Sequence, residues 1–147
     1  MAKFNRSKTY SPADHITLLG GIPIEGFSED SMVTFSWNDD HHEIAYGADG
    51  EPTVNQKLIR GGAVELHLKA TSDSNTYIAG LYAAQEVLFD AYKTLPFVTY
   101  NPRTGEKVAS AETVIQPPSD SEFGATAGDR VWRLSLPVAY QTFSPII

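Results

Sequence analysis

Apolar and polar side chains alternate with a period of two along most of this sequence. This pattern is typical of β-strands that bury one face, because successive side chains of a strand point to opposite sides. It predicts strands in residues 16–19, 22–27, 33–37, 42–47, 62–70, 97–100, 107–115 and 129–143. Turn sequences separate them, such as GG at 20–21 and DG at 49–50. The sequence therefore favours an antiparallel β-barrel or β-sandwich.

The alternation also predicts which side chains the longer strands bury. The apolar set is expected in the core and contains Val33, Phe35, Trp37, Val64, Leu66, Leu68, Trp132, Leu134, Leu136, Val138 and Tyr140. The polar set is expected to face away from the core and contains Thr34, Ser36, Glu65, His67, Lys69, Arg133, Ser135 and Gln141. Pro137 cannot donate to a β-ladder, so it predicts a bend, a bulge or a sheet edge.

Residues 74–93 break the period of two and predict the one α-helix of the fold. Their apolar side chains recur at helical spacing and form a single stripe, which contains Ile78, Leu81, Tyr82, Leu88, Phe89 and Tyr92. Asp73 or Ser74 is the expected N-cap, because a short side-chain oxygen can accept a backbone N–H of the first turn. We expect this helix to flank the β-structure and to cover one opening or face of it.

The composition is that of a single folded domain over residues 1–147. Hydrophobic residues make up 41% of the chain and charged residues 20%, and no cysteine is present. Disulfides, zinc–thiolate centres and thiol nucleophiles are thereby excluded. No secretory signal or membrane anchor is expected, and residues 1–12 and 116–129 should be the least ordered segments. The net charge of −7 argues against a surface that grips nucleic acid.

The best candidate for a metal site is the sequence DDHH, which contains Asp39, Asp40, His41 and His42. Adjacent residues of a strand point to opposite faces, so the two histidines cannot readily bind one ion together. His15 and His67 stand alone in the sequence, whereas a zinc site needs three or four convergent ligands. We therefore interpret residues 39–42 as a polar turn and expect no metal and no cofactor.

Enzymatic function has no positive support in the sequence. The turn GADG at 47–50 is followed by an extended, proline-containing segment rather than by the helix that a phosphate-binding loop requires. No serine lies in a G-x-S-x-G motif, and no pair of carboxylates has the apolar setting of an acid and a base. We expect no catalytic residues.

The connection between the predicted strands at 42–47 and 62–70 is unusually long. Hairpin loops in compact domains have about two to five residues, and longer ones are commonly functional or disordered. This connection also contains Val54, Leu58 and Ile59, so it is not a simple solvated linker. Residues 47–62 therefore predict a protruding hairpin that contacts another molecule.

Two long segments carry a resemblance to a known family. DHITLLGGIPIEGFSEDSMVTFSW and YGADGEPTVNQKLIRGGAVELHLKATSDSNTYIAGLYA, which lie within residues 14–83, resemble the tail tube proteins of contractile-tailed bacteriophages. The shared pattern is a first strand leading to I-x-G-F, then G-A-D-G, a polar hairpin, an amphipathic strand and T-S-x-S-N opening a helix. Inner-tube proteins of pyocins and type VI secretion systems have a related fold.

The resemblance implies a structural virion protein whose hexameric rings stack into a tail tube, the conduit for DNA ejection. The implied partners are further copies of the chain, the tail sheath, baseplate and tape-measure proteins, and duplex DNA that passes without specific binding. Assembly would take place in the host bacterial cytoplasm. The alternatives are another virion ring, such as a baseplate or tail-terminator component, and a small β-barrel that binds a ligand in its mouth.

The resemblance also assigns roles to residues. The hairpin would reach neighbouring subunits and rings through Gly47, Asp49, Gly50, Glu51, Val54, Gln56, Leu58, Ile59 and Arg60. Sheet edges would pair with those of neighbouring copies, and the polar strand faces would line the lumen or face solvent. Because DNA carries about one charge per 1.7 Å, we further hypothesise that excess acidic side chains make the lumen negative.

Overall fold

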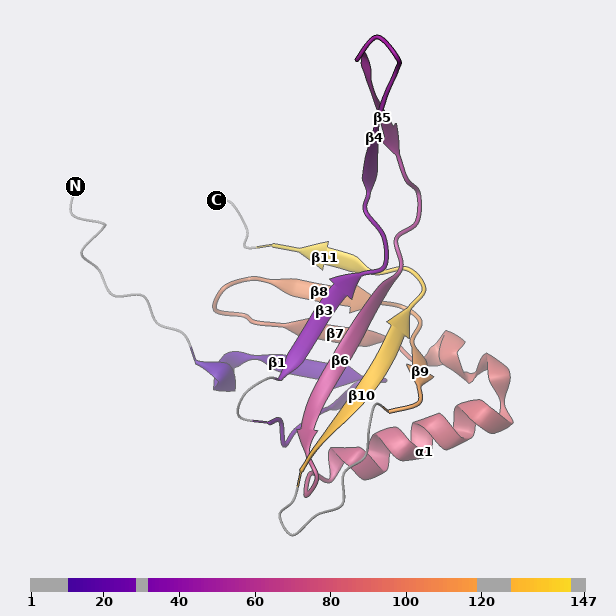
Figure 1. The fold of residues 1–147 in the computed structure, drawn as a ribbon. Helices are drawn as coiled ribbons and strands as arrows, with labels where there is room; N and C mark the ends of the chain where they lie inside the picture. The colour runs from indigo at the N-terminus through magenta and orange to yellow at the C-terminus, as the bar shows by residue number, and fades with distance from the viewer. Residues whose placement is uncertain (1–10, 29–31, 119–127, 144–147) are drawn as a thin grey trace, which may run out of the picture.

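The structure is a computed structural model that describes residues 11–28, 32–118 and 128–143. Two antiparallel sheets pack against each other, and a two-stranded hairpin stands apart from them (Figure 1). In spatial order, the first sheet contains β11 (Tyr140–Thr142), β8 (Lys107–Ser110), β7 (Phe97–Tyr100), β1 (Ile16–Leu19) and β2 (Ile22–Pro23). The second sheet contains β3 (Val33–Trp37), β6 (Gly62–Lys69), β10 (Asp129–Leu136) and β9 (Val114–Gln116). The hairpin contains β4 (His42–Tyr46) and β5 (Pro52–Gln56).

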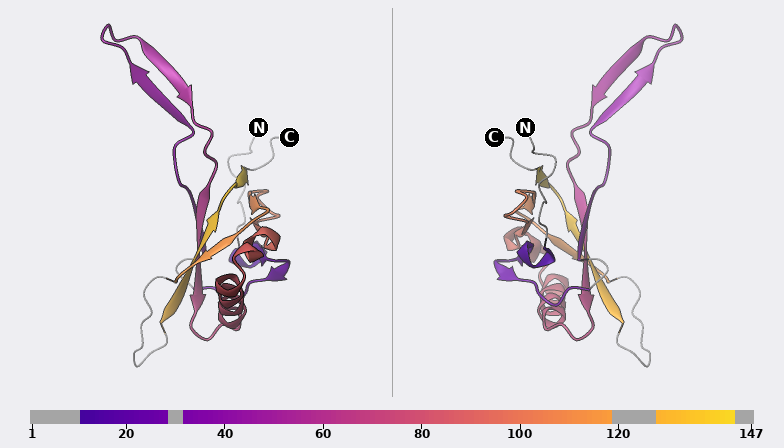
Figure 2. Two further views of the ribbon diagram at one scale, coloured as in Figure 1. Left: turned by 90° about the vertical axis from the view of Figure 1, so that its right-hand side faces the viewer. Right: turned by 90° about the vertical axis from the view of Figure 1, so that its left-hand side faces the viewer.

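The mainly-β fold with one flanking α-helix is confirmed, in the form of a sandwich rather than a closed barrel. One core lies between the two sheets and contains Leu19, Ile24, Val64, Leu66, Leu68, Ile78, Leu95, Phe97, Val108, Ile115, Trp132, Leu134, Leu136 and Ala139. The sheets are seen edge-on in Figure 2, with the hairpin continuing beyond them. No helix within the described ranges is long and apolar enough to cross a membrane.

The pairing of β6 with β10 forms the centre of the second sheet. The two strands are in register from Gly62↔Leu136 to Lys69↔Asp129, and their inward side chains alternate with outward polar ones. The predicted burial of Val64, Leu66 and Leu134 is confirmed, as each is at most 1% exposed. Burial of one such side chain contributes about 1.5–3 kcal/mol.

Pro137 ends β10 and moves the chain into the other sheet. The strand stops at Leu136, and β11 begins at Tyr140 beside β8. The predicted bend is confirmed, but the predicted burial of Val138 and Tyr140 is wrong, because both are exposed. The bend changes which residues point inward: Ala139 is buried instead, and its N–H donates to the Arg60 carbonyl at 2.8 Å.

The α-helix is shorter than predicted and is followed by a 3₁₀ helix. Helix α1 (Ser74–Val87) ends where Leu88 takes an extended conformation (φ −119°, ψ 96°), and η3 (Phe89–Thr94) follows. Ile78 is buried, but the predicted packing of Leu88 and Phe89 on the same stripe is wrong, since both are exposed. The extended residue interrupts the helical spacing, so the side chains after it no longer share the face of Ile78.

The start of α1 also differs in detail from the prediction. Asp73 occupies the N-cap position, but its side chain makes no capping hydrogen bond. The hydroxyl of Ser72 serves instead, because it accepts a hydrogen bond from the N–H of Ser74 at 3.2 Å. The Ser74 hydroxyl accepts the N–H of Glu25 at 2.9 Å, which ties the helix start to the segment after β2.

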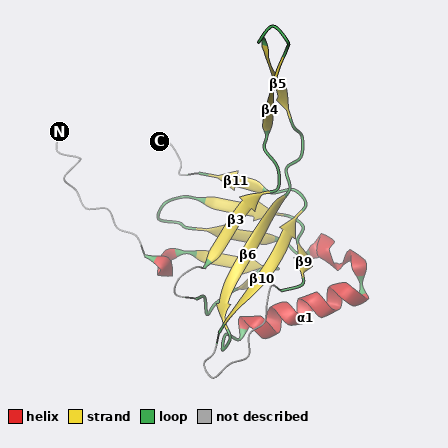
Figure 3. Ribbon diagram, in the orientation of Figure 1, coloured by secondary structure: helices red, strands yellow, loops and turns green. Residues whose placement is uncertain are grey.

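Helix α1 links the two sheets at one end of the sandwich (Figure 3). The Tyr77 hydroxyl donates to the Leu19 carbonyl of β1 at 2.8 Å, and burial raises the pKa of this phenol. On the other sheet, Trp132 Nε1 donates to the Asn75 side chain at 3.0 Å. The helix therefore closes one opening of the sandwich, as predicted.

Two further strand predictions need correction. Residues 22–27 form a strand only at Ile22–Pro23, because Gly26 has a positive φ of 77° and only an isolated bridge, Phe27↔Leu68, follows. Residues 107–115 divide into β8 and β9, which belong to different sheets. The strand predicted for residues 42–47 is confirmed as β4, which belongs to the separate hairpin. The disorder predicted for 1–12 and 116–129 falls largely outside the described residues.

We expect Phe97→Ala to lower the free energy of unfolding by about 3–5 kcal/mol, because Phe97 is 0% exposed in the core. Phe89→Ala is the matched control, since that ring is 79% exposed, and it should cost less than about 0.5 kcal/mol. Urea denaturation of the unassembled subunit measures both values. Equal losses for the two variants would contradict the assigned core.

Candidate functional site

The two-stranded hairpin projects beyond the sandwich and is called the arm here (residues 42–56; Figures 1 and 2). Its turn is closed by two backbone hydrogen bonds of 2.9 Å, from Gly47 N–H to the Glu51 carbonyl and from Gly50 N–H to the Gly47 carbonyl. Gly50 has a φ of 85°, which glycine adopts without strain. The Asp-Gly sequence therefore forms the hairpin turn that it predicts.

The boundaries predicted for the hairpin are wrong by several residues. The arm begins at His42 rather than at Gly47, and it includes β5, a strand that the period-two pattern did not reveal. The alternation of side chains at residues 42–47 indicates a strand with two different faces. It does not indicate which other strand pairs with it, so the pairing with residues 52–56 was not predicted. β5 begins with a proline and carries polar residues, so its sequence resembles a loop.

The arm has one apolar face that nothing in the described part of the chain covers. The register places Ile44 opposite Val54 and Tyr46 opposite Pro52 on that face. Ile44, Tyr46 and Val54 are 55%, 70% and 65% exposed. An isolated two-stranded hairpin is marginally stable in water, so this face favours contact with another molecule. The reverse face is more polar and carries Glu43, Ala45, Thr53 and Asn55.

The predicted contact residues all lie on the arm or on its stem (residues 57–61). Gly47, Asp49, Gly50 and Glu51 form the tip, Val54 and Gln56 belong to β5, and Leu58, Ile59 and Arg60 lie on the stem. Leu58 and Ile59 are exposed, which adds apolar surface at the base of the arm. The Arg60 guanidinium donates to the carbonyls of Lys57 and Ile59 at 2.6 and 2.9 Å and so stiffens the stem.

An ion pair and a backbone hydrogen bond join the stem to residues 39–41, which precede the arm. Lys57 Nζ lies 3.2 Å from Asp39 Oδ1, and the Lys57 N–H donates to the His41 carbonyl at 2.9 Å. The hydrogen bond from Lys57, with that from the Asp40 N–H, lowers the pKa of Asp39. Asp39 in turn raises the pKa of Lys57.

A second apolar surface lies where α1 ends, and it includes Leu88 and Phe89, which were predicted to pack on the helical stripe. Val87, Leu88 and Phe89 are all exposed there and are called the helix corner. The Phe89 ring packs edge-on against Tyr92, with the ring centroids 5.8 Å apart. The sequence indicates this exposed surface through its run of three consecutive apolar residues, because a single helical stripe cannot bury all three side chains.

The polar strand residues predicted to face lumen or solvent gather on the outer face of the second sheet, with one exception. The register aligns Thr34 with Glu65 and Glu65 with Arg133, and the same face includes Ser36, His67, Lys69 and Ser135. The exception is Gln141, which lies on β11 in the other sheet and accepts a hydrogen bond from Trp37 Nε1 at 3.0 Å.

This outer face is not acidic, so the expected negative lumen finds no support in it. Its acidic residues, Glu65 and Asp129, lie opposite the basic residues Arg133 and Lys69 in the register. His67 Nε2 also lies 3.6 Å from a Glu65 carboxylate oxygen. The acidic residues instead concentrate on the arm and its base, at Asp39, Asp40, Glu43, Asp49 and Glu51.

The two edges of the second sheet differ. At the β9 edge, the Gln85 side chain of α1 accepts a hydrogen bond from the Ile115 N–H at 2.9 Å. The same side chain donates a hydrogen bond to the Ile115 carbonyl at 3.0 Å. This side chain occupies the position of a neighbouring strand, so the expectation that every sheet edge awaits another copy is wrong for β9. β3 is the other edge, and no backbone hydrogen bond from a described residue reaches its outer side.

The candidate metal residues do not converge. His41 packs against the Trp37 ring with centroids 4.5 Å apart, whereas His42 is exposed on the arm. Across residues 11–28, 32–118 and 128–143, no three histidine, aspartate or glutamate side chains gather closely enough to hold a metal ion. His15 lies apart from these residues beside Thr99, and burial lowers its pKa.

Comparison with known proteins gives a similarity of fold but none of sequence. No family model and no curated protein matches the sequence. Among solved structures, the fold is similar to that of the anti-feeding prophage cap, the cap that terminates its tube. The TM-score is 0.57 at 10% sequence identity, and the match covers 98% of this chain and 100% of the cap chain. At this identity the likeness is one of fold alone.

Lys57→Met should raise the pKa of Asp39 toward its ordinary value, because the variant removes the largest cause of the lowering. The Asp39 pKa is lower in the folded arm, so the ion pair stabilises the stem above the ordinary aspartate pKa. That stabilisation disappears as the pH falls through the lowered value. Carboxylate-detected NMR titration measures the change, and Lys93→Met, which removes a distant lysine, is the control. An unmoved Asp39 titration in Lys57→Met would contradict the assigned pair.

Proposed function

We propose that this chain is a structural subunit of a phage-tail-related assembly, with no active site of its own. In the form that we favour, copies assemble into hexameric rings that stack into a tail tube. The observation that carries the proposal is the apolar face of the arm, which lies away from the core and is left uncovered by the described residues. The likeness of fold to the anti-feeding prophage cap and the sequence resemblance over residues 14–83 support it.

The arm and the helix corner supply two different apolar surfaces on one subunit. They lie toward opposite ends of the molecule (Figures 1 and 2). A contact between two different surfaces of identical subunits is heterologous, and it continues from copy to copy until a ring closes or a filament forms. We assign the arm to contacts between successive rings, with the helix corner as the apolar surface that receives it.

The open edge of β3 supplies the contact within a ring. An unpaired strand edge is a template for pairing with another chain, and charged or polar outward residues keep the adjoining face soluble. The outer face of the second sheet would then line the lumen, where its balanced charges neither bind nor repel passing duplex DNA strongly. The sheath, the baseplate and the tape-measure protein are the proposed partners at the other surfaces, in the virion tail.

A tube-terminating ring is the second candidate, because the similar solved structure is a tube-terminating cap. Both candidates use the same arm and the same sheet edge, and they differ in whether rings continue to stack. Negative-stain electron microscopy of the purified chain separates them. Extended tubes favour the tube subunit, single closed rings favour the terminator, and isolated subunits at high concentration contradict both.

Val54→Asp should abolish higher-order assembly while leaving the subunit folded, because it places a charge in the apolar face of the arm and outside the core. Ala45→Asp is the matched control on the reverse face of the same hairpin and should still assemble. Analytical ultracentrifugation measures assembly, and circular dichroism checks the fold. Normal assembly of Val54→Asp, or equal loss in both variants, would contradict the role of the apolar face.

A further inference from the structure

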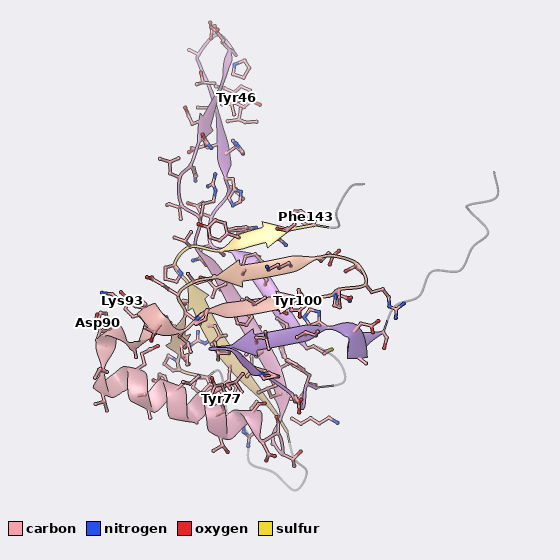
Figure 4. The ribbon with its side chains drawn as sticks, turned by 180° about the vertical axis from the view of Figure 1, so that it is seen from behind. Tyr46, Tyr77, Asp90, Lys93, Tyr100 and Phe143 are labelled. Atoms are coloured by element: carbon pink, nitrogen blue, oxygen red, sulfur yellow. The ribbon has the colours of Figure 1, made fainter. Side chains whose placement is uncertain are left out.

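A cavity of about 540 Å³ lies at the base of the arm and is called the socket. Its lining combines two aromatic rings, two carboxylates, an imidazole and an amide, from Trp37, Phe143, Asp39, Asp40, His41 and Gln141. Phe143 follows β11, the strand of the first sheet that lies nearest the arm (Figure 4). Aromatic faces and carboxylates together are the chemistry that recognises a lysine or arginine side chain.

The socket is built from side chains that are already held in place. Trp37 is fixed by its hydrogen bond to Gln141 and by edge-on contacts with the Phe35 and His41 rings, at centroid distances of 5.1 and 4.5 Å. His41 Nε2 is buried and has no hydrogen-bond partner among the described residues. Asp39 is paired with Lys57, and within the described ranges no ion pair engages Asp40.

A second cavity of about 150 Å³ adjoins the socket, because the two share Gln141 and Phe143 in their linings, and the two cavities together are called the groove. The charged or titratable side chains of the second cavity are His15, Glu106 and Lys107. His15 follows η2 (Pro12–Asp14) directly in the chain. The groove therefore runs from a point close to residue 11 to the acidic, aromatic socket.

Residues 1–10, MAKFNRSKTY, have the composition that such a groove would bind. They contain Lys3, Arg6 and Lys8 and no acidic residue, although the whole chain has a net charge of −7. Ten extended residues span about 33 Å, and the segment joins the described chain four residues before His15, which lines the second cavity. Charge, length and point of origin all match this segment of the same chain.

We propose that residues 1–10 dock along this groove of their own subunit and place a basic side chain in the socket, against Trp37, Phe143 and Asp40. The docked segment lies beside the base of the arm, so it fixes the position from which the arm projects. This site is separate from the apolar face of the arm, and it exists whether or not the subunit forms tubes.

Zero-length carbodiimide crosslinking of the full chain tests the proposal. The reagent condenses a lysine amine with a carboxylate, so that an amide forms and the carbodiimide takes up the water as a urea. Equal amounts of ¹⁴N- and ¹⁵N-labelled chains are mixed, crosslinked and analysed by mass spectrometry. We expect amides between Lys3 or Lys8 and Asp39 or Asp40, with both peptides carrying the same isotope. The Asp90–Lys93 pair, whose charged atoms lie 3.5 Å apart, is the internal standard for reactivity.

Phe143→Ala should lower the yield of these crosslinks about two- to fivefold, because it removes one aromatic wall of the socket. Tyr140→Ala is the matched control, because Tyr140 is an equally exposed aromatic residue, the first of β11, and lines neither cavity. The crosslink yield of this variant should be unchanged. Amides that join a light peptide to a heavy one would overturn the proposal in favour of docking on a second copy. Absence of these amides while Asp90–Lys93 reacts would overturn it outright.

Discussion

The pairing of β6 with β10 is the interaction on which the rest of this structure depends. These two strands share eight residue pairs and supply the largest continuous part of the buried face. Before β6, the chain leaves the sandwich to form the arm, and after it the chain enters α1. After β10, Pro137 directs the chain into the other sheet. The arm, the helix and the crossover between sheets are thus positioned by the ends of this one strand pair.

Much of the sandwich could be predicted because burial leaves a simple mark on the sequence. Val64, Leu66, Leu134 and Leu136 alternate with polar residues, and one register satisfies both strands. The predictions of burial are wrong where the local sequence pattern does not determine which side chains are buried. Alternation in the arm indicates two different faces, but not that both are exposed. The apolar run at residues 87–89 indicates that one helical stripe cannot bury all three side chains, but not where the backbone leaves the helix.

The sequence predicted that a hairpin protrudes, whereas the contact role of its residues stays a prediction. The Asp-Gly turn and the length of the connection indicated a protruding hairpin, and the resemblance supplied a reason for it. The pairing of Ile44 with Val54 depends on the hairpin register, which becomes visible only once β5 is recognised as a strand. The closure of the β9 edge could not be predicted, because Gln85 and Ile115 are thirty positions apart and meet only after α1 has packed.

The central claim is that the apolar face of the arm is completed only by another molecule. Amide hydrogen exchange, followed residue by residue in dilute and in assembled protein, tests it most directly. We expect amides of β4 and β5 to exchange rapidly in the dilute subunit and to become protected on assembly, whereas those of β6 and β10 should be protected in both states. Strong protection of the arm in the dilute subunit, or an arm that stays unprotected in the assembly, would contradict it.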